Sequence, residues 1–269
     1  MNFDIELFKR VSIFLSDCPD IISESQVESV YREGVSKDLA YLYLLKEYLR
    51  YDFDYSKIVI KENIEDYIND PYYKNIKINN VNYNGWTLKY SKIKPYELIV
   101  HDDLLLIDNN VYPNLSYFDK PFKYISVFQN NREWMTITPN EINTMKLGIE
   151  RANGSVLVAG LGLGYFAYMI SLKDNVDNIT IVELDNNVIK LFKEVILKQF
   201  EFKLKITIIN KNIYDYINEV DINKYDYTYI DIYHDVSDGL EVYKKIRQNS
   251  KLDQNKIDFW IENTMKYYL

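Results

Sequence analysis

The order of apolar and polar positions divides the chain into a helical stretch, a stretch of short strands and an alternating α/β stretch. In residues 2–70, apolar side chains recur at the spacing of one helix face, and Pro19 follows the end of that pattern. The first such stripe consists of Phe3, Leu7, Val11 and Phe14. The pattern predicts a helix there, whose stripe packs into a core.

Three more helices are expected before residue 70. The run Ser23-Glu-Ser-Gln26 has the form of a capping box, with Gly34 as the stop of its helix. Ser36 is placed to cap a third helix, and a fourth segment over residues 60–69 ends before Pro71. The stripe of the third helix is Leu39, Leu42, Tyr43 and Leu49. We interpret these stripes as core packing.

Short alternating runs broken by turn residues fill residues 76–129. Asn84-Gly85 stands between two such runs and predicts a β-hairpin. Residues 97–101 and 104–108 are expected to form a second pair around Asp102-Asp103. The stretch therefore predicts a small antiparallel β-module.

Strands and helices then alternate to about residue 232. After a helix that follows Trp134, strands are expected from residue 156 and over 179–185, 205–209 and 225–232, with helices over 165–172, 187–200 and 214–220 between them. This order is typical of a parallel sheet with right-handed crossovers. The expected fold class is α/β, and the expected regions are 1–70 (acidic, helical), 71–132 (antiparallel β-module) and 133–269 (Rossmann-like, cofactor-binding).

The run Val-Leu-Val-Ala-Gly-Leu-Gly-Leu-Gly over residues 156–164 begins this α/β stretch. It places Gly160, Gly162 and Gly164 between a buried strand and a helix, and the next strand carries Glu183 about 20 residues beyond the loop. Glycines let the backbone turn tightly and approach a ligand, and Glu183 is placed to accept hydrogen bonds from ribose hydroxyls. The pattern predicts a nucleotide-type cofactor; an ordinary tight turn is the alternative.

Composition and charge argue against several classes of partner. Residues 1–70 hold 15 acidic against 8 basic residues, and the remainder 25 against 24. A nucleic-acid partner is not expected, because no basic footprint is present. No apolar run is long enough to cross a bilayer and no signal peptide is evident, so we expect no membrane partner and a cytoplasmic location. With Cys18 as the single cysteine and only two histidines, a metal site is not expected.

From about residue 133 to 235 the chain resembles class I S-adenosylmethionine-dependent methyltransferases, and within them the spermidine synthase-like branch. The resemblance lies in the glycine loop, the Val-Glu-Leu-Asp strand end at residues 182–185 and the ends of the third and fourth strands. Met135-Thr-Ile-Thr-Pro-Asn-Glu141 before that loop also resembles uncharacterised methyltransferase-like proteins of bacteria and phages.

The resemblance implies S-adenosylmethionine as cofactor and a role for individual residues. The glycine loop would pass beneath its methionine and ribose portions, Glu183 would hold the ribose hydroxyls, and Asn212 with the Ile213 backbone would read the adenine edge. Asp231 falls at the branch's active-site carboxylate. The implied cofactor-binding residues are Gly160, Leu161, Gly162, Gly164, Glu183, Leu184, Asn212, Ile213 and Asp231.

The chain departs from the family pattern in two ways. Acids that the family carries at or near the loop are replaced here by Val158 and Leu163. Only 38 residues follow Asp231, too few for the usual end of the sheet. We therefore expect a shortened sheet of four or five strands, with residues 235–247 and 256–268 helical.

Asp231-Ile-Tyr-His-Asp235 is the expected site of reaction chemistry. Asp231, Tyr233, His234 and Asp235 are the catalytic candidates, because a carboxylate or imidazole beside the donor can take a proton from an amine or hydroxyl. The alternative is that His234 and Asp235 cap the next helix.

Thr136, Thr138 and Glu141 are the candidates for substrate binding. The structural alternative is a capping box from Thr138 to Glu141, with Pro139 at the first helical position.

The sequence thus predicts an S-adenosylmethionine-dependent methyltransferase acting on a small molecule or a protein side chain. Aminopropyl transfer in the manner of spermidine synthase is the second hypothesis, weakened by Leu163. A binding or scaffold protein that keeps the fold without turnover is the third. The methyl acceptor is not identified by the sequence, and the resemblance leaves a homodimer open, because sheet modules of this branch often pair subunits.

Overall fold

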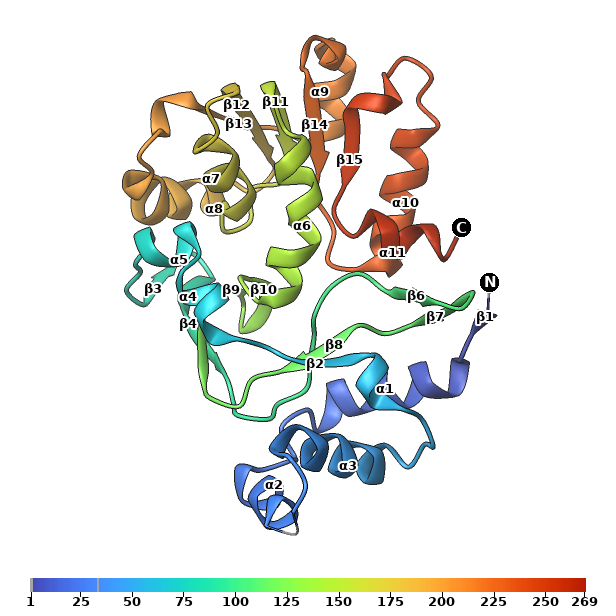
Figure 1. Cartoon of the computed structure of the whole chain (residues 1–269). Helices are drawn as coiled ribbons and strands as arrows, with labels where there is room; N and C mark the ends of the chain where they lie inside the picture. The colour runs from blue at the N-terminus through green and yellow to red at the C-terminus, as the bar shows by residue number, and fades with distance from the viewer. Residues whose placement is uncertain (1, 33) are drawn as a thin grey trace. The chain divides into compact units, whose positions relative to one another are not determined.

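The structure, a computed structural model, describes residues 2–32 and 34–269 and divides into two compact units. Unit 1 combines the chain up to Ile68 with Ser91–Tyr124, and unit 2 combines Asn69–Tyr90 with Ile125–Leu269. The units therefore interleave along the chain, which Figure 1 traces from the N-terminus to the C-terminus. Within the described residues, no helix is both long and apolar enough to cross a membrane.

Three helices in unit 1 lie where the sequence predicts them, although Phe3 of the first predicted stripe lies in a short strand before the first helix. The helices are α1 (Ile5–Asp17), α2 (Glu24–Tyr31) and α3 (Lys37–Leu49). The predicted caps are confirmed: Ser23 forms a capping box with Gln26, and the Ser36 side chain accepts the backbone N–H of Leu39 at 3.2 Å.

The prediction of a helix over residues 60–69 is wrong for its first part. Residues 59–61 form strand β2 (Val59–Lys61), and only α4 (Ile64–Ile68) is helical. The β-branched Val59 and Ile60 favour the strand, which pairs in parallel with β8 (Leu115–Tyr117).

Two three-stranded sheets complete unit 1. Their orders are β1 (Asn2–Phe3), β7 (Asn110–Tyr112), β6 (Leu105–Ile107), and β2, β8, β5 (Ile99–Val100). The pair predicted between residues 97–101 and 104–108 is wrong, because β5 pairs with β8 and β6 with β7. The hairpin turn lies instead at Asp108-Asn109, where φ is 49° and 62°, the values that a tight two-residue turn requires. These two antiparallel pairs are accompanied by two parallel ones, β1 with β7 and β2 with β8.

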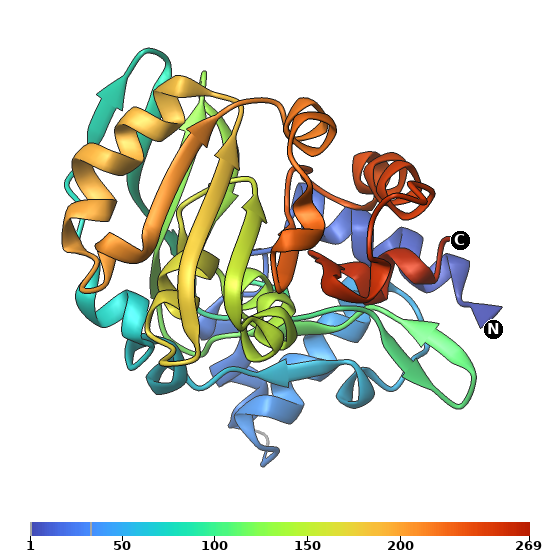
Figure 2. The same cartoon turned by 90° about the horizontal axis from the view of Figure 1, so that it is seen from above.

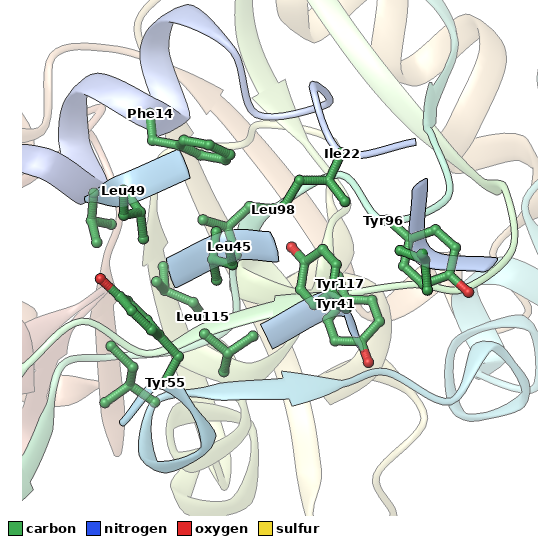
Figure 3. Close-up of a cluster of buried hydrophobic side chains, with 14 of the residues drawn as sticks. Phe14, Ile22, Tyr41, Leu45, Leu49, Tyr55, Tyr96, Leu98, Leu115 and Tyr117 are labelled. Carbon is green, nitrogen blue, oxygen red and sulfur yellow. The ribbon is translucent and has the colours of Figure 1, made fainter. Parts of the chain in front are cut away.

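The core of unit 1 is built around aromatic rings between α3 and the sheet (Figure 3). The rings of Tyr41 and Tyr117 lie with their centroids 3.9 Å apart, and the ring of Tyr96 stacks on that of Tyr117 at 5.8 Å. Leu45 and Leu115 are buried in the same cluster. The stripe predicted for the third helix is therefore wrong in part: Leu39 and Tyr43 are exposed, and α3 buries Leu49 together with Ala40, Tyr41 and Leu45.

Unit 2 begins with α5 (Pro71–Asn75) and includes the hairpin predicted at Asn84-Gly85. That turn joins β3 (Val81–Tyr83) to β4 (Trp86–Ile93), and both of its residues have positive φ, 46° and 81°. The sheet order is β10-β9-β4-β3, with β9 at Phe122–Gln129 and β10 at Arg132–Thr136.

A five-stranded parallel sheet dominates unit 2 (Figure 2). Its order is β13-β12-β11-β14-β15, which numbers 3-2-1-4-5 along the chain, and each adjacent pair is parallel. The strands are β11 (Gly154–Ala159), β12 (Val176–Glu183), β13 (Ile206–Asn210), β14 (Tyr227–Ile230) and β15 (Ile257–Phe259). This order confirms the Rossmann-like fold expected from the sequence.

Helices precede, connect and follow these strands. They are α6 (Pro139–Arg151), α7 (Tyr165–Ser171), α8 (Asn186–Leu191), continued by a π-helical turn over Phe192–Ile196, α9 (Ile213–Glu219), α10 (Val236–Arg247) and α11 (Glu262–Lys266). Short 3₁₀ turns lie at Tyr55–Lys57 in unit 1 and at Leu197–Gln199, Lys203–Lys205, Ile222–Lys224 and Gln254–Lys256 in unit 2.

The predicted shortened sheet is confirmed, but the expected helix over 256–268 is wrong in its first part. Residues Ile257–Phe259 form the edge strand β15, which pairs with β14, and only α11 is helical. Ile257 and Phe259 are both buried, so their alternation serves a sheet rather than a helix.

Candidate functional site

A cavity of about 480 Å³ lies in unit 2 at the carboxyl ends of the parallel strands. Its wall is made by residues 160–162 after β11, 182–185 at the end of β12, 211–214 after β13 and 231–234 after β14. Open α/β sheets bind ligands at this edge, and the volume suits a small molecule. The cavity is therefore lined by the segments that carry the predicted site residues.

Close approach of the backbone explains two glycines of the loop. Gly160 has φ 95°, and a Cβ there would overlap the carbonyl oxygen of Asp231. Gly162 has φ 49°, and a Cβ there would overlap the thioether sulfur of Met135, which accepts the backbone N–H of Leu163 at 3.2 Å. Gly160, Leu161 and Gly162 line the cavity, whereas Gly164 lies outside the lining at the start of α7.

Glu183 ties the glycine loop to the end of β12. Its Oε2 accepts the backbone N–H of Leu161 at 3.0 Å, and its Oε1 accepts that of Asp185 at 2.8 Å. The carboxylate also lines the cavity, where burial raises its pKa in spite of these backbone donors. Each oxygen keeps a lone pair for a further donor, so the group can still accept a ligand hydroxyl.

Asn212 and Ile213 line the next part of the wall, after β13. The side-chain oxygen of Asn212 accepts the backbone N–H of Tyr214 at 2.9 Å and so caps α9. Leu184, 68% exposed, lies on the lining as well. These three predicted cofactor-binding residues therefore line the cavity, and Asn212 also caps a helix.

Asp231, directly after β14, and Glu141 on α6 face the cavity. Burial, with the charge of Glu183, raises the pKa of Asp231 to about 7. Burial, with the charge of Asp231, raises the pKa of Glu141 well above its ordinary value. A carboxyl group that titrates near neutral pH can accept and return a proton, so Asp231 has the property required of an acid–base group.

Three of the four catalytic candidates line the cavity, and the fourth does not. Tyr233 and His234 line the cavity with Asp231, and the imidazole of His234 lies 4.0 Å from the ring of Trp134, centroid to centroid. Asp235 lies outside the lining and caps α10, accepting the backbone N–H of Ser237 at 2.7 Å.

The cap of α10 is a full capping box, because Asp238 accepts the backbone N–H of Asp235 at 3.1 Å. Asp238 also accepts the backbone N–H of His234 at 3.1 Å. The capping alternative expected for this segment is thus present, alongside the cavity position of His234.

Of the three candidates for substrate binding, which precede the glycine loop, only one lines the cavity. Glu141 lines the cavity, whereas Thr136 and Thr138 lie outside the lining with their hydroxyls 3.4 Å apart. Pro139 takes the first helical position as expected, but among the described residues Thr138 makes no side-chain cap. The alternative of a capping box from Thr138 to Glu141 is therefore not formed, and Glu141 lines the cavity instead.

Sequence reasoning missed the aromatic wall. Trp86 on β4, Trp134 on β10 and Trp260 after β15 all line the cavity, and the first two rings meet edge-on at 5.8 Å. Lys211 also lines it, and its ammonium pairs with Glu219. The tryptophans come from three separate segments, so no local motif links them. Within residues 2–32 and 34–269, no group of three His, Cys, Asp or Glu side chains is arranged to hold a metal.

The sequence matches no protein-family model and no curated protein. Part of the chain is similar in structure to a spermidine synthase in complex with the transition-state analogue AdoDATO, with 18% identity and a TM-score of 0.33 over 42% of this chain and 43% of that one. Spermidine synthase from Thermotoga maritima gives the same identity and score over 43% and 44%.

A candidate SAM-dependent methyltransferase from Streptococcus mutans is 16% identical, with a TM-score of 0.33 over 58% of this chain and 39% of that one. The chain thus spans less than half the length of each of these proteins. They are the two classes of protein that the sequence resembles, but scores at this level support no inference about activity.

Proposed function

We propose that the cavity binds S-adenosylmethionine and that the protein is a methyltransferase acting on a small molecule or a protein side chain. The position of Glu183 carries the proposal. Its carboxylate ends β12, holds the N–H of Leu161 in the glycine loop and lines the cavity. An acid at the end of the second strand, in contact with the loop after the first, is the arrangement that binds the ribose of a nucleotide-type ligand.

The remaining wall fits the other parts of such a ligand. Near Glu183, the cavity wall includes the apolar side chain of Leu184 and the Ile213 segment. Asn212 adds a side-chain amide to this part of the wall. Met135 and Leu161 line the side where the loop turns. When bound, S-adenosylmethionine supplies an electrophilic methyl group on a sulfonium.

The chain then has to orient an acceptor and remove a proton from it. Asp231 is the group for the second task, since its pKa of about 7 lets it exist in both protonation states near neutral pH. Tyr233 is held in place because its hydroxyl donates to the backbone carbonyl of Trp260. Alignment of the acceptor by such fixed walls is the main requirement of methyl transfer.

The test is calorimetric titration of the whole chain with S-adenosylmethionine, S-adenosylhomocysteine, decarboxylated S-adenosylmethionine, methylthioadenosine and NAD. Glu183→Ala is the variant, and Glu194→Ala is the matched control, because Glu194 is exposed and pairs with Lys198 on the surface. We expect the first two ligands to bind the wild type and the control, and Glu183→Ala to weaken both by about 100-fold.

The other outcomes assign the site differently. A preference for the decarboxylated donor and methylthioadenosine would indicate aminopropyl transfer. Binding of NAD alone would indicate redox chemistry. Absence of binding to all five, with a cooperative thermal transition, would contradict the proposal and favour a scaffold.

A further inference from the structure

The charges around the cavity are mostly negative and mostly already engaged. Of the described lining residues, Lys211 is the only lysine or arginine, and it pairs with Glu219. Glu183 accepts two backbone N–H groups, and Asp185 caps α8 by accepting the N–H of Asn187 at 2.7 Å. The two remaining acids of the lining are Glu141 and Asp231.

Glu141 has a wholly buried oxygen without a partner. Its Oε2 accepts no hydrogen bond from any described residue, although the group lies in the first turn of α6, where it could have reached back to Thr138. A buried polar atom is normally satisfied, and a carboxylate left alone keeps its full desolvation penalty. A donor carried by a ligand in the cavity would remove that penalty.

The charge of Asp231 acts on Glu141, since it contributes to the raised pKa of that group. A buried carboxyl group whose pKa is raised by a neighbouring carboxylate is stabilised in its ionised form by a cation placed near both. Aromatic side chains line the same cavity (Trp134, Tyr233 and Trp260), and such rings favour an organic cation over a bare ion. The Trp260 ring is fixed, because its indole N–H donates to Thr144 Oγ1 at 2.9 Å.

We propose that Glu141 and Asp231 form a subsite for an ammonium group of the ligand, with Glu141 as a specificity-determining residue. This assignment rests on the proposed function in one respect, the identity of the molecule that carries the ammonium group. That molecule is either the methyl donor, through its amino-acid end, or an amine acceptor. The chemistry is the same in both cases.

The experiment compares Glu141→Gln with Glu150→Gln, a matched change on the same helix at an exposed position outside the cavity. Both are titrated with S-adenosylhomocysteine, which has an ammonium group, and with methylthioadenosine, which lacks the amino-acid end. n-Butylamine, with 1-butanol as its neutral counterpart, is titrated in the presence of methylthioadenosine. Thermal unfolding confirms that each variant is folded.

We expect Glu141→Gln to weaken at least one ammonium-bearing probe by about tenfold or more, with methylthioadenosine, 1-butanol and the Glu150→Gln variant unchanged. Loss with S-adenosylhomocysteine assigns the subsite to the donor, and loss with n-butylamine assigns it to the acceptor. Unchanged affinity for both in folded Glu141→Gln would overturn the subsite. If the wild type binds neither adenosine ligand, the proposed function fails, and n-butylamine titrated alone then decides the ammonium subsite separately.

Discussion

Gly160 passes so close to Asp231 that a Cβ on the glycine would overlap the carbonyl oxygen of the aspartate. This contact joins the loop after β11 to the end of β14, and it lies where both line the cavity. The same glycine has φ 95°, in the region that residues with side chains rarely adopt. The local geometry of the site therefore depends on the absence of a single methyl group.

Gly160→Ala is expected to destabilise the protein by about 3 kcal/mol, because backbone strain and overlap with a carbonyl act together. Gly34→Ala is the matched control. Gly34 has a similar φ of 98°, but a Cβ there meets no described atom within 4 Å, so only the strain applies, at about 1 kcal/mol. Urea denaturation measures both, and equal losses would contradict the overlap.

Asp231 makes stability depend on pH in a definite direction. Its pKa is raised to about 7, so between about pH 4 and 7 the folded state holds a proton that the unfolded state has released. The free energy of unfolding therefore falls as pH rises through this window and then levels off. Asp231→Asn should remove this slope and be more stable than the wild type at pH 8 by on the order of 1–2 kcal/mol.

Denaturation at pH 5 and pH 8 checks this, with Asp177→Asn, a change of an exposed residue near the start of β12, as the control. A wild type whose stability does not fall relative to Asp231→Asn between these pH values would show that Asp231 is not buried as described.

Lys173 stabilises the end of α6. Its ammonium donates to the backbone carbonyls of Ile149, Glu150 and Ala152 at 2.6, 2.8 and 2.6 Å. These carbonyls lie at the helix C-terminus, where a cation is favourable. Lys173→Met is expected to cost about 1–3 kcal/mol of stability, because it leaves partly buried carbonyls without a donor.

Chemical denaturation tests the loss, and Lys198→Met is the control, since Lys198 makes an exposed pair with Glu194. Such pairs contribute about 0–1 kcal/mol. A loss no larger than that of the control would remove Lys173 from the groups that hold α6 in place.

In unit 1, Glu62 is a buried carboxylate with two donors. His101 Nδ1 lies 2.6 Å from its Oε1, and the Tyr67 hydroxyl donates to its Oε2 at 2.8 Å. Burial alone would raise the pKa of Glu62, but the bonds from His101 and Tyr67 help to hold it below its ordinary value. The stability that this carboxylate contributes is present above its unfolded pKa and is lost as pH falls through the folded pKa.

Glu62→Gln should therefore lower stability at pH 7 by about 1–3 kcal/mol and flatten the acid limb of the denaturation curve. Glu65→Gln, an exposed change on α4, is the control. An unchanged acid limb in Glu62→Gln would place the acid sensitivity of unit 1 elsewhere.

Local patterns were enough to predict the order of strands and helices in the α/β stretch and the hairpin at Asn84-Gly85. Apolar runs mark buried parallel strands, and Asn-Gly is suited to a turn with two positive φ values. The edge strand at Ile257–Phe259 was not predictable in this way. It is only three residues long, and it is a strand because β14 offers it a partner.

The site shows the same division. Gly160, Glu183 and Asp231 follow strands, so the parallel order places them together. Thr138 and Glu141 fit a capping box and a cavity wall equally well as a pattern, and the choice depends on the cavity that lies beyond α6. The tryptophans of the wall are far apart in the sequence, and single tryptophans carry no signal of their position in a fold.

The interleaving of the two units has a consequence for synthesis on the ribosome. The helices α1 and α3 emerge early, but Leu115 and Tyr117, which fill their shared core, are added only after the hairpin of unit 2 has been made. A nascent chain ending at Ile68 therefore exposes the apolar faces of these helices. The core of unit 1 cannot form until the chain has been synthesised to about Tyr124. Truncation before that residue should yield an aggregation-prone fragment rather than a small domain.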